Sequence, residues 1–423
     1  MAETKTLGIL VGGGPAPGIN GVISAATIEA RNRGLRVLGF FEGFRWLMQE
    51  TELKMGEHYR ELHIRDVSRI HVTGGSILRT SRANPTRDKA LLKTVVRNLQ
   101  ALGVRYLLTI GGDDTAFSAA KVHEVSGGEI AVAHVPKTID NDLPLPDNMP
   151  TFGFESARHL GTLLVQNLME DARTTQRWYI VVAMGREAGH LALGIGKAAG
   201  ATLILIPEEF PDQMDLAFVV DTILGSYAKR RAEGRYYGVV VVAEGIAEKL
   251  KPETLELCEG LQTDEHGHLI LSEIPLGRIL KEAAERELEK LGIKSRWVEQ
   301  EIGYVLRSAR PIAFDIEYTR NLGYGAVKFL LEGGTGAMVA FRRGKLYRLY
   351  FDDIMDPRTG RTRVRLVDIH SENYEVASHY MIRLRKDDFD DPQLVEAMAR
   401  SLHMEPEAFT RRFRRVAVSA HGR

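Results

Sequence analysis

Cysteine is almost absent from this chain. Cys258 is the single cysteine among 423 residues, so no disulfide can form within the chain, and an oxidising compartment is not indicated. Cys258 lies in a Leu- and Glu-rich stretch without a neighbouring motif, which favours a structural residue over a nucleophile.

A charge excess of either sign and long apolar runs are missing as well. The chain has 56 Lys and Arg against 56 Asp and Glu, so it has no general attraction to nucleic acid or anionic membranes. Apolar runs such as 201–206 and 239–243 are far shorter than the roughly 20 residues of a membrane span. The first residues carry no signal-peptide pattern. We therefore expect a cytoplasmic protein with neither nucleic acid nor membrane as a partner.

Short apolar runs alternate with helical segments along most of the chain. Uniformly apolar strands separated by helices are typical of parallel sheets buried on both faces. The pattern predicts an α/β fold with two doubly wound, mainly parallel lobes. The expected strands are 7–11, 37–41, 106–110, 130–135, 178–183, 203–206 and 237–243, and the expected helices are 19–33, 89–102, 115–125, 156–171, 190–199, 215–231 and 277–291.

A proline-rich stretch at 143–150 interrupts this rhythm and is suited to a link between lobes. We predict one lobe over 1–150 and a second over 151–311, with part of 312–340 completing the first. Residues 337–423 form a C-terminal extension to which the sequence assigns no role; strands are expected at 337–350 and 362–367 and helices at 392–416.

The segment from Lys137 to Asp142 concentrates charge directly after the apolar run 130–136. Open α/β sheets bind ligands at the carboxyl ends of their strands. A carboxylate there can take a proton from a hydroxyl or hold a metal ion, and a lysine beside it can neutralise a phosphate. The segment therefore indicates phosphoryl transfer.

Two glycine loops each stand between an expected strand and an expected helix. The first, Gly12 to Gly18, fails the dinucleotide fingerprint because Pro17 occupies the last glycine position, and it fails the P-loop pattern because Ile19 and Asn20 follow Gly18. A tight turn without a ligand explains it equally well. The second is Gly111-Gly112-Asp113-Asp114, where helix capping explains the acids but not the paired glycines. We interpret Asp113 as a carboxylate on the side of a metal ion.

Together these motifs resemble the phosphofructokinase family over residues 5–335. The matching stretches occur in family order: the first glycine loop, Gly74-Gly75-Ser76 with Ser81-Arg82, Gly111-Gly112-Asp113, Thr138-Ile139-Asp140-Asn141-Asp142, Met184-Gly185-Arg186 and Pro207-Glu208. The resemblance implies two lobes of phosphofructokinase type and transfer of a phosphoryl group to fructose 6-phosphate.

Two positions resemble the branch of the family that uses pyrophosphate. ATP-using members usually carry glycine where this chain has Asp114 and Lys137. A carboxylate at Asp114 would repel the α-phosphate of a nucleotide, and Lys137 would stabilise charge on pyrophosphate in the transition state. The implied reaction is reversible and gives fructose 1,6-bisphosphate and phosphate, as in glycolysis and gluconeogenesis.

The resemblance also implies residue roles. Asp140 is the general base for the sugar 1-hydroxyl, and Thr138 orients the reacting groups. Asp113 holds Mg²⁺, the expected cofactor, with Asp142 in support. Contacts to the phosphate donor are expected from Gly14, Arg82 and Gly112.

The sugar pocket is expected to be shaped by Ile139, Asp140, Met184, Gly185, Arg186 and Glu244, with Glu244 as a solvated strand end in the alternative interpretation. The segment Tyr304 to Arg307 matches a Tyr-x-x-Arg motif in which Arg307 binds the 6-phosphate. Arg177 corresponds to an arginine that reaches a neighbouring subunit, so a homodimer or homotetramer is expected.

Three other functions stay open at this stage. An ATP-dependent 6-phosphofructokinase that tolerates Asp114 is the nearest. A non-catalytic regulatory subunit of the same fold is disfavoured because Asp113, Asp140 and Arg186 are all present. A nicotinamide-dependent dehydrogenase is disfavoured by the failed dinucleotide pattern.

Overall fold

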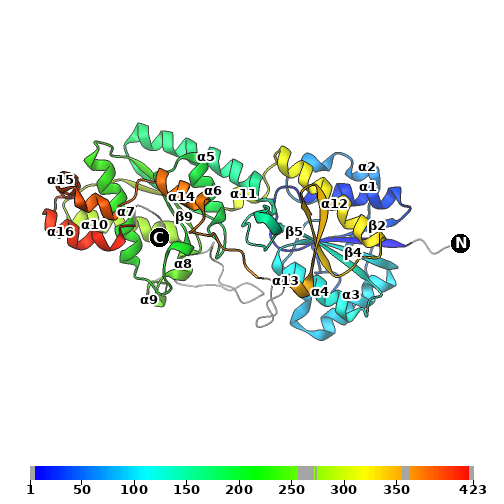
Figure 1. Cartoon of the computed structure of the whole chain (residues 1–423). Helices are drawn as coiled ribbons and strands as arrows, with labels where there is room; N and C mark the ends of the chain where they lie inside the picture. The colour runs from blue at the N-terminus through cyan, green and yellow to red at the C-terminus, as the bar shows by residue number, and fades with distance from the viewer. Residues whose placement is uncertain (1–4, 256–270, 272–273, 355–362, 419–423) are drawn as a thin grey trace. The chain divides into compact units, whose positions relative to one another are not determined.

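The computed structural model describes residues 5–255, 271, 274–354 and 363–418, and it divides into two compact units (Figure 1). Unit 1 contains the described residues among 1–157 and 304–365, and unit 2 contains those among 158–303 and 366–418. Cys258 lies outside the described residues. No helix within the described ranges is long and apolar enough to cross a membrane.

Unit 1 is built on an eight-stranded sheet in the order β12-β11-β5-β4-β1-β2-β3, with β6 paired to β5. The pairs β1–β2, β1–β4, β4–β5, β5–β6 and β5–β11 are parallel, whereas β2–β3 and β11–β12 are antiparallel. The strands are β1 Thr6–Val11, β2 Arg36–Phe40, β3 Tyr59–Glu61, β4 Val104–Gly111, β5 Ala131–Thr138, β6 Phe152–Gly153, β11 Ala337–Arg342 and β12 Lys345–Tyr350.

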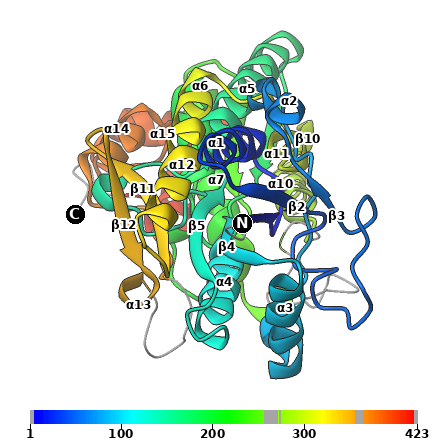
Figure 2. The ribbon, with the colours of Figure 1, turned by 90° about the vertical axis from the view of Figure 1, so that its right-hand side faces the viewer.

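Helices cover both faces of this sheet, as Figure 2 shows. One face packs on α1 and α12 through a core that includes Ile19, Ile23, Leu322 and Phe329. The other face packs on α3 and α4 through a second core. Burial on both faces explains why the central strands are apolar throughout. The helices of unit 1 are α1 Ile19–Asn32, α2 Ile64–Val67, α3 Lys89–Ala101, α4 Asp113–Val125, α11 Tyr304–Arg307, α12 Ala313–Leu331 and α13 Phe351–Ile354.

Unit 2 contains a four-stranded sheet in the order β10-β7-β9-β8, and its pairs are all parallel. The strands are β7 Trp178–Ala183, β8 Leu203–Leu205, β9 Gly238–Ala243 and β10 Trp297–Ile302. The helices are α5 Phe154–Thr175, which contains the boundary between the units, and α6 His190–Ala199, α7 Leu216–Ala232, α8 Ile246–Lys249, α9 Pro252–Leu255, α10 Leu276–Lys290, α14 Glu372–Tyr380, α15 Pro392–Ser401 and α16 Pro406–Phe413. The predicted α/β class with two mainly parallel sheets is confirmed.

The structure places the division of the chain differently from the sequence pattern. The boundary follows Ala157, and the proline-rich stretch 143–150 belongs to unit 1, where Leu143 and Leu145 are buried in the core. Prolines suit a linker, but they also suit an irregular segment packed by its leucines.

The C-terminal extension is shared between the units. The hairpin β11–β12 extends the sheet of unit 1, and the residues from Leu366 onward belong to unit 2. The expected strand at 362–367 is wrong for its described residues, because 363–367 form no strand and pair with neither sheet. The expected helices at 392–416 are present as α15 and α16.

Candidate active site

Three loops of unit 1 lie at one edge of its sheet. They follow β1, β4 and β5, which are neighbouring parallel strands, so their carboxyl ends face the same way. These loops carry the glycines after Val11, the acids after Gly112 and the charged segment that ends at Asp142. The topology therefore brings together the residues that the sequence assigned to the phosphate donor and to the base.

The first glycine loop is held from several sides. The N–H of Gly12 donates to Ile110 O at 2.9 Å, and the N–H of Gly13 donates to Ser81 O at 2.9 Å. The Thr80 hydroxyl donates to Gly13 O at 2.5 Å. Lys137 Nζ donates to Gly14 O at 2.5 Å, so the predicted charge-stabilising lysine contacts the predicted pyrophosphate loop. Arg82 is exposed and directly follows the segment that binds Gly13.

Thr115 explains why glycines are needed in both loops. A Cβ on Gly12 would lie 2.9 Å from Thr115 Cγ2, and a Cβ on Gly111 would lie 2.7 Å from the same methyl group. Thr115 is buried in the first turn of α4. The glycine at these two positions is therefore required by packing, a reason that neither the ligand interpretation nor the turn interpretation of the sequence contained.

The segment from Lys137 to Asp142 is ordered by its own contacts. β5 extends through Thr138, beyond the predicted end at residue 135, because Lys137 and Thr138 pair with Phe152 and Gly153 of β6. The N–H of Asp140 donates to Thr138 Oγ1 at 2.9 Å, and Asn141 adopts a left-handed φ of 60°. Ile139 is buried at the start of the turn.

Asp140 carries a buried carboxylate oxygen without a hydrogen-bond partner among the described residues. Its Oδ1 is shielded from solvent, and no described donor satisfies it. A native protein rarely leaves such an oxygen unpaired, because the desolvated group costs about 1–3 kcal/mol. The arrangement is suited to a carboxylate that accepts a proton from a bound hydroxyl.

His134 supports the second glycine loop from within β5. Its Nε2 lies 3.0 Å from Gly111 O and its Nδ1 lies 2.8 Å from the Thr109 hydroxyl. A carbonyl only accepts, so Nε2 carries the proton and Nδ1 accepts from Thr109. Burial lowers the pKa of His134 to about 3, and the nearby Lys137 charge also opposes protonation. This histidine is a neutral structural support.

Asp113 and Asp114 occupy the first turn of α4, where carboxylates complement the helix dipole. Gly112 is the N-cap residue and contributes no side-chain cap. Within the described ranges no group of three or more His, Cys, Asp or Glu side chains could hold a metal ion. One or two carboxylates with substrate phosphate oxygens are nevertheless what Mg²⁺ prefers. The carboxylates at this edge of the sheet therefore fit a metal ion that is also coordinated by substrate phosphate oxygens.

Arg307 lies against the first glycine loop. A Cβ on Gly14 would lie 2.7 Å from Arg307 Cζ, so glycine leaves the space that the guanidinium fills. The guanidinium also lies over the ring of Tyr304, 5.1 Å from its centroid. The structure thus brings Gly14, Lys137 and Arg307 together, although the resemblance assigned Arg307 to the sugar phosphate.

In unit 2, Met184, Gly185 and Arg186 follow β7 and Glu244 follows the neighbouring parallel strand β9. Glu244 Oε1 accepts the N–H groups of Gly185 at 3.0 Å and Arg186 at 2.8 Å. Glu244 is buried, so the alternative of a solvated strand end is wrong. Arg186 has a left-handed φ of 51°, which this carboxylate helps to hold.

Glu208 supports the same edge of unit 2. Its Oε1 accepts the N–H of Gly189 at 2.9 Å and the N–H of Val367 at 2.8 Å, and burial raises its pKa. Arg177 immediately precedes β7, at the opposite end of the strand from Met184. Arg177 is therefore not part of the Met184–Arg186 edge, and its predicted role at a neighbouring subunit is not tested within one chain.

The comparisons with known proteins agree on one family. The model described as Phosphofructokinase matches residues 6–330. A pyrophosphate–fructose 6-phosphate 1-phosphotransferase of Thermotoga maritima is 58% identical over 418 residues and 98% of both chains. One of Naegleria fowleri is 50% identical over 97% of this chain and 96% of its own.

A solved structure shares the fold. The crystal structure of a pyrophosphate-dependent phosphofructokinase from Marinobacter aquaeolei has a TM-score of 0.66 and 20% sequence identity, and the match covers 89% of this chain and 91% of that one. At this identity the match bears on the fold alone.

Proposed function

Because this chain belongs to the phosphofructokinase family, we propose that it transfers a phosphoryl group reversibly from pyrophosphate to the 1-hydroxyl of fructose 6-phosphate. The products are fructose 1,6-bisphosphate and phosphate. The observation that carries the proposal is the identity of 58% and 50%, over nearly the whole chain, with two proteins that bear the name of this reaction. The predicted family is confirmed by these matches.

Asp140 is the proposed general base. The buried Oδ1 without a described partner supports this role, because a bound hydroxyl would satisfy it. The proton moves from the sugar 1-hydroxyl to this carboxylate as the oxygen attacks phosphorus and the bond to the departing phosphate breaks. Thr138 fixes the peptide of Asp140 through its Oγ1 and thereby orients the base.

Lys137 is the proposed stabiliser of charge on pyrophosphate. It is buried, and its contact with Gly14 O aims the ammonium at the loop whose backbone would bind the donor. Gly112 and Arg82 are the further proposed donor contacts. A fixed cation in a poorly solvated site lowers the barrier because it needs no reorganisation during the reaction.

A divalent metal is implied by the family, and we propose Mg²⁺. Asp113 would hold the ion, with Asp142 in support. The ion would neutralise charge on the phosphate oxygens, and the small number of carboxylates at this edge fits a cation that keeps several waters.

Asp114 is the proposed determinant that excludes ATP. Its position in the first turn of α4, beside Asp113, supports a location next to the donor phosphates. Two like charges at 4 Å and an effective dielectric of 20 repel by about 4 kcal/mol, enough to bias the choice of donor strongly. The alternative of an ATP-dependent 6-phosphofructokinase rests on relatives of that name at lower identity, 33% and 32%.

In unit 2 we propose that Met184, Gly185, Arg186 and Glu244 form the sugar side of the site. The bonds from Gly185 and Arg186 to Glu244 support a preformed turn there. Assembly into a homodimer or homotetramer, with Arg177 serving a neighbouring subunit, and a cytoplasmic location stay predictions.

The proposal is tested by assaying purified protein with pyrophosphate, fructose 6-phosphate and Mg²⁺ in both directions, alongside Asp140→Asn. We expect turnover in both directions by the wild type. Asn cannot accept the proton, so kcat of the variant should fall by at least about 100-fold with an unchanged circular dichroism spectrum. An Asp140→Asn variant with near-normal kcat would show that Asp140 is not the base.

A further inference from the structure

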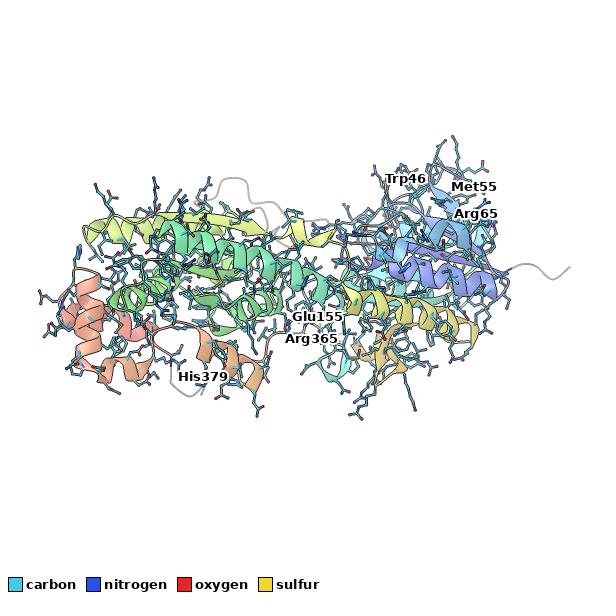
Figure 3. All side chains as sticks on the ribbon, turned by 90° about the horizontal axis from the view of Figure 1, so that it is seen from above. Trp46, Met55, Arg65, Glu155, Arg365 and His379 are labelled. Carbon is cyan, nitrogen blue, oxygen red and sulfur yellow. The ribbon has the colours of Figure 1, made fainter. Side chains whose placement is uncertain are left out.

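Arg365 lies outside the residues matched by the family model and contacts the loop that carries the proposed base. It is partly buried in unit 1 and is labelled in Figure 3. Its Nε and Nη2 donate to Asn141 O at 3.0 and 2.9 Å, and Nη2 also donates to Asn141 Oδ1. Its Nη1 donates to Met149 O at 2.9 Å.

The main chain of Arg365 makes a further contact with the same loop. Its N–H donates to Asp142 O at 2.6 Å. Backbone and side chain of one residue therefore bind Asn141 and Asp142, the two residues that follow Asp140. The link spans more than 200 residues of sequence, as the separation of 224 between Arg365 and Asn141 shows.

Asn141 forms the turn that directly follows Asp140. Its φ of 60° is left-handed, a region that Asn enters more readily than most L-residues, and the contacts of Arg365 fix the turn in this conformation. Its Oδ1 also accepts the N–H of Thr151 at 3.0 Å. The planar guanidinium matches the carbonyl and the side-chain oxygen of Asn141 together, which a lysine ammonium cannot do with the same geometry.

The loop is thus fixed on both sides of Asp140. On the amino side, Thr138 Oγ1 accepts the N–H of Asp140 at 2.9 Å. On the carboxyl side, Arg365 holds the peptide between Asn141 and Asp142 through Asn141 O. Burial of part of a guanidinium costs free energy, which its hydrogen bonds to Asn141 and Met149 offset. A cation that donates to the backbone oxygens of Asn141 and Met149 is suited to fixing the conformation of this turn.

We propose that Arg365 is a positioning residue for phosphoryl transfer: by binding Asn141 and Met149 it holds the Asp140 carboxylate in its reactive orientation. The proposal rests on the proposed function of Asp140 as the base. It assigns a role in the reaction to the C-terminal stretch beyond the family match.

The test compares Arg365→Ala and Arg365→Lys with a matched control, Arg342→Ala. Arg342 also binds the segment after Asp140, through Asp147 at 2.7 and 2.8 Å, but from an exposed position and through a side chain alone. We expect kcat of Arg365→Ala to fall by between about tenfold and 100-fold, as for a misplaced catalytic group, while KM for both substrates changes little. Arg365→Lys should lose less, and Arg342→Ala should behave as the wild type.

Chemical rescue separates positioning from general stability. Guanidinium chloride at millimolar concentration should restore kcat of Arg365→Ala several-fold by entering the vacated site, and it should not raise kcat of Arg342→Ala. Kinetics are measured with the phosphoryl donor that the wild type uses. If the wild type does not turn over pyrophosphate, the proposed function is wrong. The kcat values of the Arg365 variants, measured with the donor that is used, would still test the role of Arg365.

Three results would overturn the role of Arg365. They are a kcat of Arg365→Ala close to that of the wild type, an equal loss in Arg342→Ala, or a loss that guanidinium does not restore. If Arg365→Ala does not fold, Arg365→Lys decides: a reduced kcat with an unchanged unfolding midpoint supports the role, and an unchanged kcat contradicts it.

Discussion

The neutral state of His134 predicts a specific dependence of stability on pH. The folded protein holds this histidine at a pKa of about 3, against 6.5 for a free histidine. Between these values the unfolded chain binds one more proton than the folded chain. Stability from this group is therefore fully present above pH 6.5 and is lost as pH falls toward 3. Each pH unit in this window costs about 1.4 kcal/mol, so lowering the pH to 5 should cost about 2 kcal/mol.

The measurement is urea unfolding followed by circular dichroism between pH 8 and pH 5, for the wild type and for His134→Gln. At pH 8 the variant should be less stable by about 1–3 kcal/mol, because the bonds to Thr109 and Gly111 O are disturbed. Below pH 6.5 its stability should fall less steeply than that of the wild type, by up to about 1.4 kcal/mol per pH unit. His63→Gln, at an exposed position, is the control for loss of a histidine outside the core. Equal slopes in wild type and His134→Gln would refute the assignment of a buried neutral His134.

Two further predictions concern the two units separately. In unit 2, Arg383 and Glu209 form an ion pair at 2.8 Å, and their side chains are only 6% and 5% exposed. Arg383→Met should leave the Glu209 carboxylate buried without this partner and lower the free energy of unfolding, measured by urea titration, by about 3–5 kcal/mol. A loss below about 1 kcal/mol, as for a surface ion pair, would contradict this prediction. In unit 1, Gly14→Ala should displace the guanidinium of Arg307 rather than the backbone of the loop. Steady-state kinetics should therefore show a reduced kcat, while the midpoint of unfolding stays unchanged. A normal kcat would show that turnover does not require the guanidinium of Arg307 beside the loop.

Much of the fold was predictable from the sequence because parallel strands buried on both faces are short, uniformly apolar runs. The central strands and the loops after them were located within a few residues. The largest error at the site was the end of β5, which was expected at residue 135 and lies at Thr138. The pairing of Lys137 with Phe152 extends the strand, and a contact of that kind has no local signal.

The side chains that hold the loops of the site in place were less predictable, because they contact residues that are distant in the sequence. Thr115 packs against the glycines of two loops, and Glu208 accepts the N–H of Gly189. No sequence pattern around Thr115 or Glu208 predicts these contacts. The stretch at 362–367, which contains Arg365, was predicted as a strand. Its hydrogen bonds go instead to the Asn141 turn in unit 1.

The most direct test of the central claim is the ratio of kcat/KM for pyrophosphate to kcat/KM for ATP, measured with fructose 6-phosphate for the wild type and for Asp114→Gly. A repulsion of about 4 kcal/mol corresponds to roughly a 1,000-fold preference, so we expect the wild type to prefer pyrophosphate by about that factor. Asp114→Gly should lower the ratio by increasing turnover with ATP. A wild type that prefers ATP, or a ratio that Asp114→Gly leaves unchanged, would contradict the account of donor selection.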